Sequence, residues 1–314
     1  MKAAVIDGYG PPDVLRIAQA ARPSIRDDQV LIEVHASSVN PIDWRIRNGS
    51  LRMLMGSRFP KILGFDVSGR VVEAGQAVKE LREGDRVYAK SDAMTGQAYA
   101  EYAAVSEKAA AIKPAGLSHE QAAAMPLAAL TSLQALRERG GIKPGDRVAV
   151  IGASGGVGSY AVQIAKAYGA EVTAVCSAGN IDLARELGAD RVVDYIEEDV
   201  LAARGAYEIV FDAVAARGFS EARRALSERG VYISTVPSAG LAFSIAWSRL
   251  TPGRKASFIM LKASGEDLKE LARLAEKGKL KSVIDSVYPL EDIQEAHRKS
   301  ESRRARGKIV IRIR

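Results

Sequence analysis

The chain has 314 residues, of which 47% are hydrophobic and 26% charged, and this length is enough for about two domains. The composition excludes a largely disordered chain, and no apolar run approaches the roughly 20 residues that cross a bilayer. One cysteine excludes an intramolecular disulfide framework and a cysteine-cluster zinc site. The net charge of +7 favours anionic partners, which include a phosphate-bearing cofactor as well as nucleic acid. Because Asp7 comes too early for a signal-peptide core, we expect a cytoplasmic protein.

Residues 1 to about 120 are expected to form short strands separated by turns. Glycine, proline and aspartate punctuate this region, as in Gly10-Pro11-Pro12 and Gly84-Asp85. The predicted strands are Lys2–Ile6, Val30–Ser37, Gly69–Ala74, Arg86–Lys90 and Ala98–Val105. The pattern predicts a compact, mostly β unit.

From about residue 120, apolar strands alternate with helical stretches. The predicted strands are Arg147–Ile151, Glu171–Cys176, Arg191–Asp194, Ile209–Val214, Val231–Val236 and Phe258–Lys262. Helices are predicted between them at Gly156–Tyr168, Ile181–Leu187 and Phe219–Ser227. This alternation is typical of an α/β domain with right-handed crossovers and a parallel sheet covered on both faces. A terminal strand, Lys308–Ile313, has no such crossover and is expected to return to the first unit.

The strongest local pattern is a glycine-rich loop between the strand Arg147–Ile151 and the helix that follows it. Its glycines Gly152, Gly155 and Gly158 are spaced one residue wider at the front than G-x-G-x-x-G. In a strand–loop–helix context, glycines allow close backbone approach, and the helix N-terminus directs free N–H groups at a pyrophosphate. We therefore predict that a dinucleotide is bound by Gly152, Ser154, Gly155, Gly156, Val157 and Gly158. A glycine turn without a ligand is the alternative.

The end of the next strand bears on the choice of dinucleotide. The strand ends at Cys176-Ser177, where an NAD enzyme carries a carboxylate for the ribose hydroxyls. The lack of that carboxylate removes a repulsion against a 2′-phosphate. Ser177 and Asn180 offer hydrogen bonds there, and Arg185 is a nearby cation. These residues predict NADPH as the cofactor, the alternative being a strand end without selectivity.

Further motifs extend over nearly the whole chain. They are Val39-Asn40-Pro41-Ile42-Asp43-Trp44, Gly64-Phe65-Asp66-Val67-Ser68-Gly69, Gly84-Asp85-Arg86-Val87, Leu130-Thr131-Ser132, Leu187-Gly188-Ala189-Asp190, Asp194-Tyr195 and Gly307-Lys308-Ile309-Val310. With the glycine loop, they make the chain resemble the zinc-free quinone oxidoreductase (zeta-crystallin-like) branch of the medium-chain dehydrogenase/reductase superfamily. The resemblance implies a chaperonin-10-like β domain (residues 1–122 and 264–314) and a Rossmann domain with a doubly wound parallel sheet (residues 123–263).

The resemblance also concerns metal. Zinc-dependent relatives carry a cysteine at the position of Asn40, and a histidine and a glutamate at the positions of Phe65 and Asp66. With these ligands replaced and one cysteine in the chain, we expect neither a catalytic nor a structural zinc. The remaining histidines, His35, His119 and His297, are expected at the surface or as capping residues.

By the same resemblance, the predicted catalytic residues follow Val39. Asn40 is expected to face the nicotinamide and to polarise or orient the substrate, or else to be a turn residue before Pro41. Asp43 belongs to the same segment and is alternatively a helix cap. Arg45 stands where several relatives carry a tyrosine, and it either pairs with Asp43 or meets the substrate.

Four more residues complete the predicted site. Thr131 is expected near the nicotinamide and Tyr195 near the adenosine phosphate. Val214 and Val236 end two predicted strands and are included among the cofactor-binding residues.

Hydride chemistry without a metal suits some substrates better than others. Hydride addition to a quinone or an α,β-unsaturated carbonyl places negative charge on an oxygen that one hydrogen-bond donor can stabilise. Oxidation of a simple alcohol needs a base or a Lewis acid. We therefore predict a zinc-independent, NADPH-dependent reductase of quinones or enones. The alternatives are an enoyl thioester or alkenal reductase, an NADPH-sensing protein with little turnover, and a nucleic-acid-binding protein that uses the basic run Arg298–Lys308.

Two further predictions concern the surface. The stretch Pro237–Lys255 is either a cleft wall or lid, or a helical excursion on the surface. In relatives, the last Rossmann strands of two subunits pair across a dimer axis, so Ser257–Lys262 is a predicted edge of a homodimer.

Overall fold

The computed structural model describes all 314 residues, which form two compact units. The first unit combines Met1–Leu130 with Lys262–Arg314, and the second comprises Thr131–Leu261. The chain passes from the first unit to the second within helix α4 (Pro126–Gln134), which a π-helical turn (Ala135–Arg139) extends.

The first unit is built on two β-sheets. Its strands are β1 (Lys2–Ile6), β2 (Leu15–Gln19), β3 (Gln29–Val39), β4 (Lys61–Ile62), β5 (Asp66–Ala74), β6 (Arg86–Lys90), β7 (Tyr102–Ser106), β8 (Ala110–Ile112), β15 (Ile284–Pro289) and β16 (Lys308–Arg312). A three-stranded sheet has the order β2-β1-β4, and a seven-stranded sheet has the order β15-β16-β3-β5-β6-β8 with β7 on the free part of β3.

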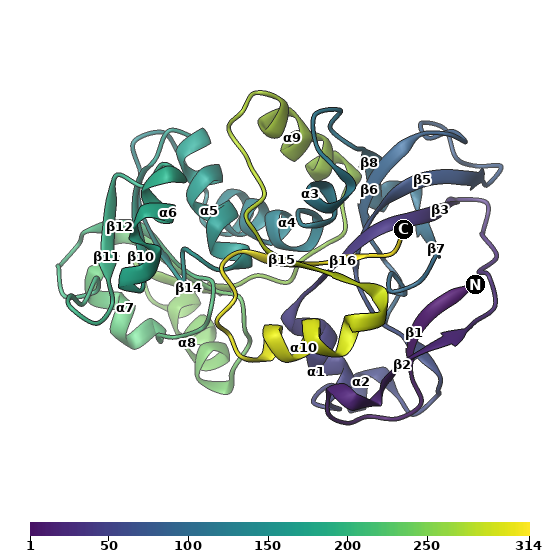
Figure 1. The fold of residues 1–314 in the computed structure, drawn as a ribbon. Coiled ribbons are helices and arrows are strands. Elements are labelled where there is room, and N and C mark those ends of the chain that lie inside the picture. The colour runs from purple at the N-terminus through teal and green to yellow at the C-terminus, as the bar shows by residue number, and fades with distance from the viewer. The chain divides into compact units, whose positions relative to one another are not determined.

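The terminal strand β16 returns to this unit, as predicted. It pairs antiparallel with β3, so that Ile309 lies opposite Val39 and Arg312 opposite Ala36. Figure 1 shows the yellow β16 and the purple β3 side by side. This register brings the residues that start β16 next to the residues that end β3.

Short helices cover the sheets of the first unit. They are α1 (Pro41–Arg47), α2 (Arg52–Met55), α3 (His119–Ala123), α9 (Gly265–Glu276), α10 (Ile293–Glu301) and the 3₁₀ turns Pro12–Val14, Glu107–Ala109 and Leu290–Asp292. Helix α1 starts where Asn40, in an extended conformation, precedes Pro41, whose fixed φ suits the first helical position. The Asp43 carboxylate then accepts a hydrogen bond from the Asn40 N–H at 2.7 Å, so the capping role considered for Asp43 is present. Helix α1 packs against α10 (Figure 1).

The second unit has one sheet of six parallel strands. They are β9 (Arg147–Ile151), β10 (Glu171–Cys176), β11 (Arg191–Asp194), β12 (Tyr207–Asp212), β13 (Leu226–Ser234) and β14 (Lys255–Phe258), in the order β11-β10-β9-β12-β13-β14. The connecting helices are α5 (Gly156–Ala167), α6 (Ile181–Glu186), α7 (Phe219–Ala225), α8 (Ala239–Leu250) and the 3₁₀ turn Ala178–Asn180.

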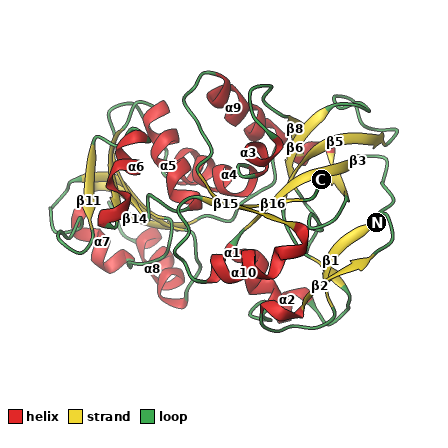
Figure 2. Ribbon diagram, viewed as in Figure 1, coloured by secondary structure: helices red, strands yellow, loops and turns green.

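The strand order places the helices of this unit on both faces of the sheet. From β9 the chain moves outward to β11, then returns to β12 and moves outward on the other side. Right-handed crossovers in opposite directions put α5 and α6 on one face and α7 and α8 on the other, as Figure 2 shows. The reversal lies between β9 and β12, where doubly wound sheets bind their ligands.

Some predicted boundaries are wrong. The strand predicted at Ala98–Val105 starts only at Tyr102, because the preceding segment crosses to β1, where Ala4 N–H donates to Tyr99 O. The last strand is Lys255–Phe258 rather than Phe258–Lys262, because its register with β13 pairs Lys255 with Val231. No helix in the structure is both long enough and apolar enough to cross a membrane.

Candidate functional site

The predicted cofactor residues of the second unit gather at one edge of its sheet. The strands are parallel, so their carboxyl ends lie together. The glycine loop follows β9, Ser177 follows β10, Tyr195 follows β11, Val214 comes two residues after β12, and Val236 two residues after β13. The predicted cofactor residues therefore lie along one edge of the sheet, on both sides of the point between β9 and β12 where the strand order reverses.

The glycine loop has the geometry that a pyrophosphate site requires. Gly152 has a φ of +80°, which favours glycine, and its N–H donates to Val175 O. A Cβ on Gly158 would lie 2.1 Å from Gly152 O, so only glycine lets α5 start this close to the strand. At Gly155 a Cβ would lie 3.4 Å from Gly152 O, an ordinary van der Waals contact, so the chain itself does not require glycine there. Helix α5 begins at this loop. The first N–H groups of a helix have no hydrogen-bond acceptor within the helix, so those of α5 are available to an anion. These features fit a dinucleotide pyrophosphate.

At the end of β10, Asn180 Nδ2 donates to Ser177 Oγ at 3.0 Å, so these two residues form one polar turn. Arg185 lies one turn along α6 and is exposed, with Asp182 3.4 Å away. The structure adds a carboxylate that the prediction did not consider, because Asp194 ends β11 in register with Cys176. Its Oδ1 accepts from the Ile196 N–H.

Two of the other predicted site residues are exposed to solvent and a third is buried. Tyr195 and Val214 are 61% and 52% exposed, which leaves both side chains free to contact a ligand. Thr131 is buried in α4.

In the first unit, Asn40 and Asp66 belong to a buried polar cluster. Asp66 Oδ2 accepts from Ser38 Oγ at 2.5 Å and from Asn40 Nδ2 at 2.7 Å, while its Oδ1 accepts from the Leu127 N–H at 2.7 Å. The Lys308 ammonium lies 2.5 Å from Asn40 Oδ1 and 3.4 Å from Asp66 Oδ2. Lys308 is only 3% exposed, so a buried cation neutralises a buried carboxylate.

This cluster does not fit the zinc ion of the zinc-dependent relatives. Phe65 offers no donor atom, and the oxygens of Asn40 and Asp66 already accept hydrogen bonds from an ammonium. The Lys308 ammonium therefore bonds Asn40 and Asp66, the two residues that stand at zinc-ligand positions of the zinc-dependent relatives.

Asp43 lies in the same region and is completely buried. Its Oδ2 accepts from Asn40 N–H and from the Tyr99 hydroxyl at 3.0 Å, whereas its Oδ1 has no partner. Burial raises the pKa of Asp43 to about 7, although both hydrogen bonds oppose the shift. Burial also raises the pKa of Tyr99 well above its usual range.

Arg45 does not pair with Asp43, and that alternative is wrong. Asp43 Oδ2 accepts from Asn40 and Tyr99, its Oδ1 has no partner, and the Arg45 guanidinium lies over the Trp44 ring, 5.5 Å from its centre. Arg45 is half-buried and makes no ion pair. Desolvation lowers the pKa of Arg45, and the nearby Arg303 lowers it further.

A second lysine, Lys90, belongs to this region and was not among the predicted site residues. Its ammonium lies 5.0 Å from the centre of the Phe65 ring. Burial lowers the pKa of Lys90, while the charges of Asp66, Asp92 and Asp43 oppose that shift. Neither Lys90 nor Lys308 belongs to a spacing pattern that predicts a functional role, although Lys308 lies within the Gly307-Lys308-Ile309-Val310 motif.

The expectation that His297 is a surface or capping residue is wrong. His297 is fully buried, because α10 turns it between Arg47 and Tyr99. Arg47 is buried as well and pairs with Glu301 at the end of α10. Burial lowers the pKa of His297 to about 3. The other two histidines, His35 and His119, are half-buried and stack with their ring centres 4.3 Å apart.

The basic run Arg298–Lys308 is not a continuous cationic surface. Arg298 pairs with Asp13 and Glu295, Lys299 lies 3.4 Å from Asp285, and Lys308 is buried. Arg303, Arg304 and Arg306 are exposed and form no ion pair, so these three arginines are the cations of the run that a nucleic acid could meet.

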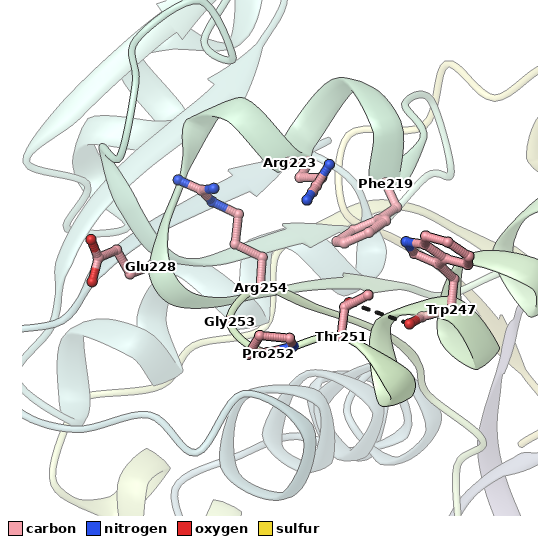
Figure 3. Close-up of a pocket in the computed structure, with 8 residues that line it drawn as sticks. All are labelled: Phe219, Arg223, Glu228, Trp247, Thr251, Pro252, Gly253 and Arg254. Carbon is pink, nitrogen blue, oxygen red and sulfur yellow. Dashed lines mark hydrogen bonds between the residues drawn. The ribbon is translucent and has the colours of Figure 1, made fainter.

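The segment predicted as a lid or a surface excursion forms helix α8. Its outer face carries Phe243 and Trp247, both exposed, with their rings stacked 6.4 Å apart. A hollow of about 310 Å³ adjoins this helix (Figure 3). It is lined by Phe219, Arg223, Glu228, Trp247, Thr251, Pro252, Gly253 and Arg254. Since Glu228 and Arg254 precede the paired residues Val231 and Lys255, the hollow extends to the amino ends of β13 and β14 and away from the glycine loop.

Comparison with known proteins agrees with this arrangement. Residues 26–115 match the family described as alcohol dehydrogenase GroES-like domain, and residues 187–311 match the family described as zinc-binding dehydrogenase. The chain is 37% identical to a chloroplastic quinone-oxidoreductase homolog from Spinacia oleracea, over 99% of this chain and 98% of the relative. It is 35% identical to a chloroplastic NADPH-dependent alkenal/one oxidoreductase from Arabidopsis thaliana, over 99% and 79%.

Solved structures of similar proteins cover the whole chain. The quinone oxidoreductase from Coxiella burnetii superposes with a TM-score of 0.91 and 35% identity, over 100% of this chain and 99% of that one. The quinone oxidoreductase from Escherichia coli complexed with NADPH superposes with a TM-score of 0.86 and 28% identity, over 100% of both chains. These matches confirm the predicted fold class.

Proposed function

Because this chain is an oxidoreductase of the medium-chain dehydrogenase/reductase superfamily, among its quinone oxidoreductases, we propose that it reduces quinones or α,β-unsaturated carbonyl compounds with NADPH and without zinc. The observation that carries the proposal is the Lys308 ammonium on Asn40 and Asp66. With a cation already bound to these oxygens, the cluster provides no Lewis acid for alcohol oxidation. Reduction of an electron-poor carbon needs only hydride and a donor for the oxygen.

NADPH supplies the hydride when bound, and the chain's own residues hold it in place. The N–H groups at the start of α5 are directed at the pyrophosphate. Ser177 and Asn180 form the polar turn that meets the 2′-phosphate, and Tyr195 contacts the adenosine side. The Arabidopsis relative is named as an NADPH-dependent alkenal/one oxidoreductase, which supports the inclusion of enones beside quinones.

The decisive experiment is NADPH consumption measured in parallel against quinones, enones and saturated aldehydes. NADP⁺ reduction by alcohols is measured beside it, with NADH as the cofactor control. We expect turnover with quinones or enones, none with alcohols, and no change after treatment with a chelator. Chelator-sensitive alcohol oxidation would overturn the zinc-free assignment. Tight NADPH binding without turnover of any carbonyl compound would favour the sensing alternative.

We also propose a cytoplasmic homodimer. The edge strand β14 has β13 on one side and no strand of this chain on the other, which is the arrangement that strand pairing between subunits needs. Light scattering after size exclusion is expected to give twice the chain mass. A monomer at all concentrations would contradict this.

A further inference from the structure

Lys90 is placed on the sheet next to the buried cluster of Asn40, Asp66 and Lys308. It ends β6, and its register partner on β5 is Asp66. Paired residues of neighbouring strands direct their side chains to the same face. The Lys90 side chain therefore leaves the sheet on the same side as Asp66, and its ammonium comes to rest near the Phe65 ring, 5.0 Å from its centre.

The two lysines of this region differ in one respect. Lys308 Nζ has three acceptors, namely Asn40 Oδ1, Val39 O and Asp66 Oδ2. Lys90 has none, because no oxygen lies within hydrogen-bond or ion-pair distance of its ammonium, although most of its side chain is shielded from water. The Lys90 ammonium is not among the buried polar atoms that lack a partner, so it still reaches solvent. Its protons are therefore available to a ligand that enters beside the cluster.

The three carboxylates nearest to Lys90 are those of Asp66, Asp92 and Asp43, and none of them forms an ion pair with its ammonium. Asp66 already accepts hydrogen bonds from Ser38, Asn40, Lys308 and the Leu127 N–H. The one bonded oxygen of Asp43 is taken by Asn40 and Tyr99. Because Lys308 balances Asp66, the cluster has a cation at Lys90 to which no anion within the chain is bonded.

We propose that the Lys90 ammonium is a catalytic residue that binds the carbonyl oxygen of the substrate and stabilises the negative charge formed on it by hydride addition. The inference rests on the proposed function and assigns its oxyanion donor. A new C–H bond forms at the electron-poor carbon as the π-electron pair moves to oxygen, so that the substrate is reduced while the nicotinamide is oxidised. Lys90 keeps its proton and donates a hydrogen bond to the resulting enolate, which in the case of a quinone tautomerises by moving a ring proton to the second oxygen and so becomes the hydroquinone monoanion. A proton from solvent completes the product.

The first test compares Lys90→Met and Lys90→Arg with the wild-type enzyme. Removal of a donor from an oxyanion site lowers kcat by about 10²–10³-fold. We expect this loss in Lys90→Met with NADPH binding unchanged, and a partial recovery in Lys90→Arg. In Lys90→Ala, added ethylammonium is expected to restore part of kcat, which a purely structural role would not allow.

Lys61 provides a matched control. Its ammonium also lies over a phenylalanine, 4.7 Å from the Phe59 ring centre, but it donates to Met55 O and Arg58 O. Lys61→Met is expected to retain wild-type kcat. The melting temperature of each variant shows whether a loss of activity reflects unfolding.

A second test does not depend on turnover. With NADP⁺ present, 4-nitrophenol serves as a visible probe of a bound phenolate. The wild-type protein is expected to lower the apparent pKa of the bound phenol, and Lys90→Met is expected not to. Wild-type turnover combined with unchanged kcat and unchanged phenolate binding in Lys90→Met would overturn the inference and leave the proposed function intact. If the wild-type protein turns over no carbonyl compound, the proposed function fails, and the phenolate titration still decides whether Lys90 binds an oxyanion.

Discussion

Lys308 and Asn40, 268 residues apart in the chain, are joined by a hydrogen bond of 2.5 Å from the ammonium Nζ to the amide Oδ1. A lysine can only donate and a carboxylate can only accept, so the Asn40 amide has one orientation between Lys308 and Asp66. Its Nδ2 is therefore directed at Asp66 and at Ser38 O. The catalytic role of Asn40 stays a prediction, and Lys308 is the residue that positions its side chain.

Replacement of Lys308 tests this pairing. Lys308→Met leaves the Asp66 carboxylate buried without its cation, and we expect the free energy of unfolding to fall by about 3–5 kcal/mol. Urea denaturation measures the loss. The double variant Asp66→Asn/Lys308→Met is expected to recover most of it, because no charge is then left unpaired. A single variant as stable as the wild type would contradict the pairing.

Asp43 makes stability depend on pH. Its pKa is about 7 in the folded protein against 3.8 for the free side chain, so the folded state binds the extra proton between these values. The free energy of unfolding therefore falls as pH rises through this range, by roughly 4 kcal/mol for a shift of this size. In Asp43→Asn the difference from wild type should grow in the variant's favour from pH 4 to pH 7. Parallel pH–stability curves from denaturant titration would exclude this role.

His297 acts in the opposite direction. Its pKa is about 3 when folded and 6.5 for the free side chain, so the unfolded state binds more protons in this range. The wild-type protein should lose stability as pH falls from 6.5 toward 3. His297→Leu keeps a similar volume, removes the unpartnered Nε2, and should lack this part of the acid sensitivity. Thermal melts at pH 5 and pH 7.5 measure the difference, and equal shifts in both proteins would refute it.

The glycine loop allows a paired comparison. In Gly158→Ala the new Cβ would lie 2.1 Å from Gly152 O, which is backbone and cannot move aside, so the start of α5 must shift. We expect NADPH affinity to fall at least about tenfold, which corresponds to about 1.4 kcal/mol. Gly155→Ala, with no contact nearer than 3.4 Å, should keep its folded stability. Fluorescence titration with NADPH measures the affinity, and an unchanged Gly158→Ala would remove the loop from the cofactor site.

Cofactor choice is tested at Ser177. Ser177→Asp places a carboxylate at the end of β10, where it repels a 2′-phosphate and accepts from ribose hydroxyls. The ratio of kcat/KM for NADPH to that for NADH should fall, whereas Ser177→Ala should change it little. If Ser177→Asp leaves the ratio unchanged, selectivity lies elsewhere, for example at Asp194 on the neighbouring strand.

The fold was predictable from short segments of sequence. The strand–loop–helix at Arg147–Ala167 and the alternation that follows are local patterns, and each helix or strand reveals its type within about ten residues. Strand ends were less predictable, because the start of β7 and the end of β14 depend on which neighbour each segment pairs with.

By itself, the sequence determined the α/β class, the glycine loop and the lack of zinc ligands at Asn40 and Phe65. Only the tertiary structure decided that Lys308 neutralises Asp66, that His297 is buried and that Lys90 is left without an acceptor. The reason is physical, since these relations join residues tens to hundreds of positions apart. The two lysines are placed by the registers of β3 with β16 and of β5 with β6, and His297 is placed by the packing of α10 on α1. A local pattern of hydrophobic and polar residues contains no information on which charge will meet which across a sheet.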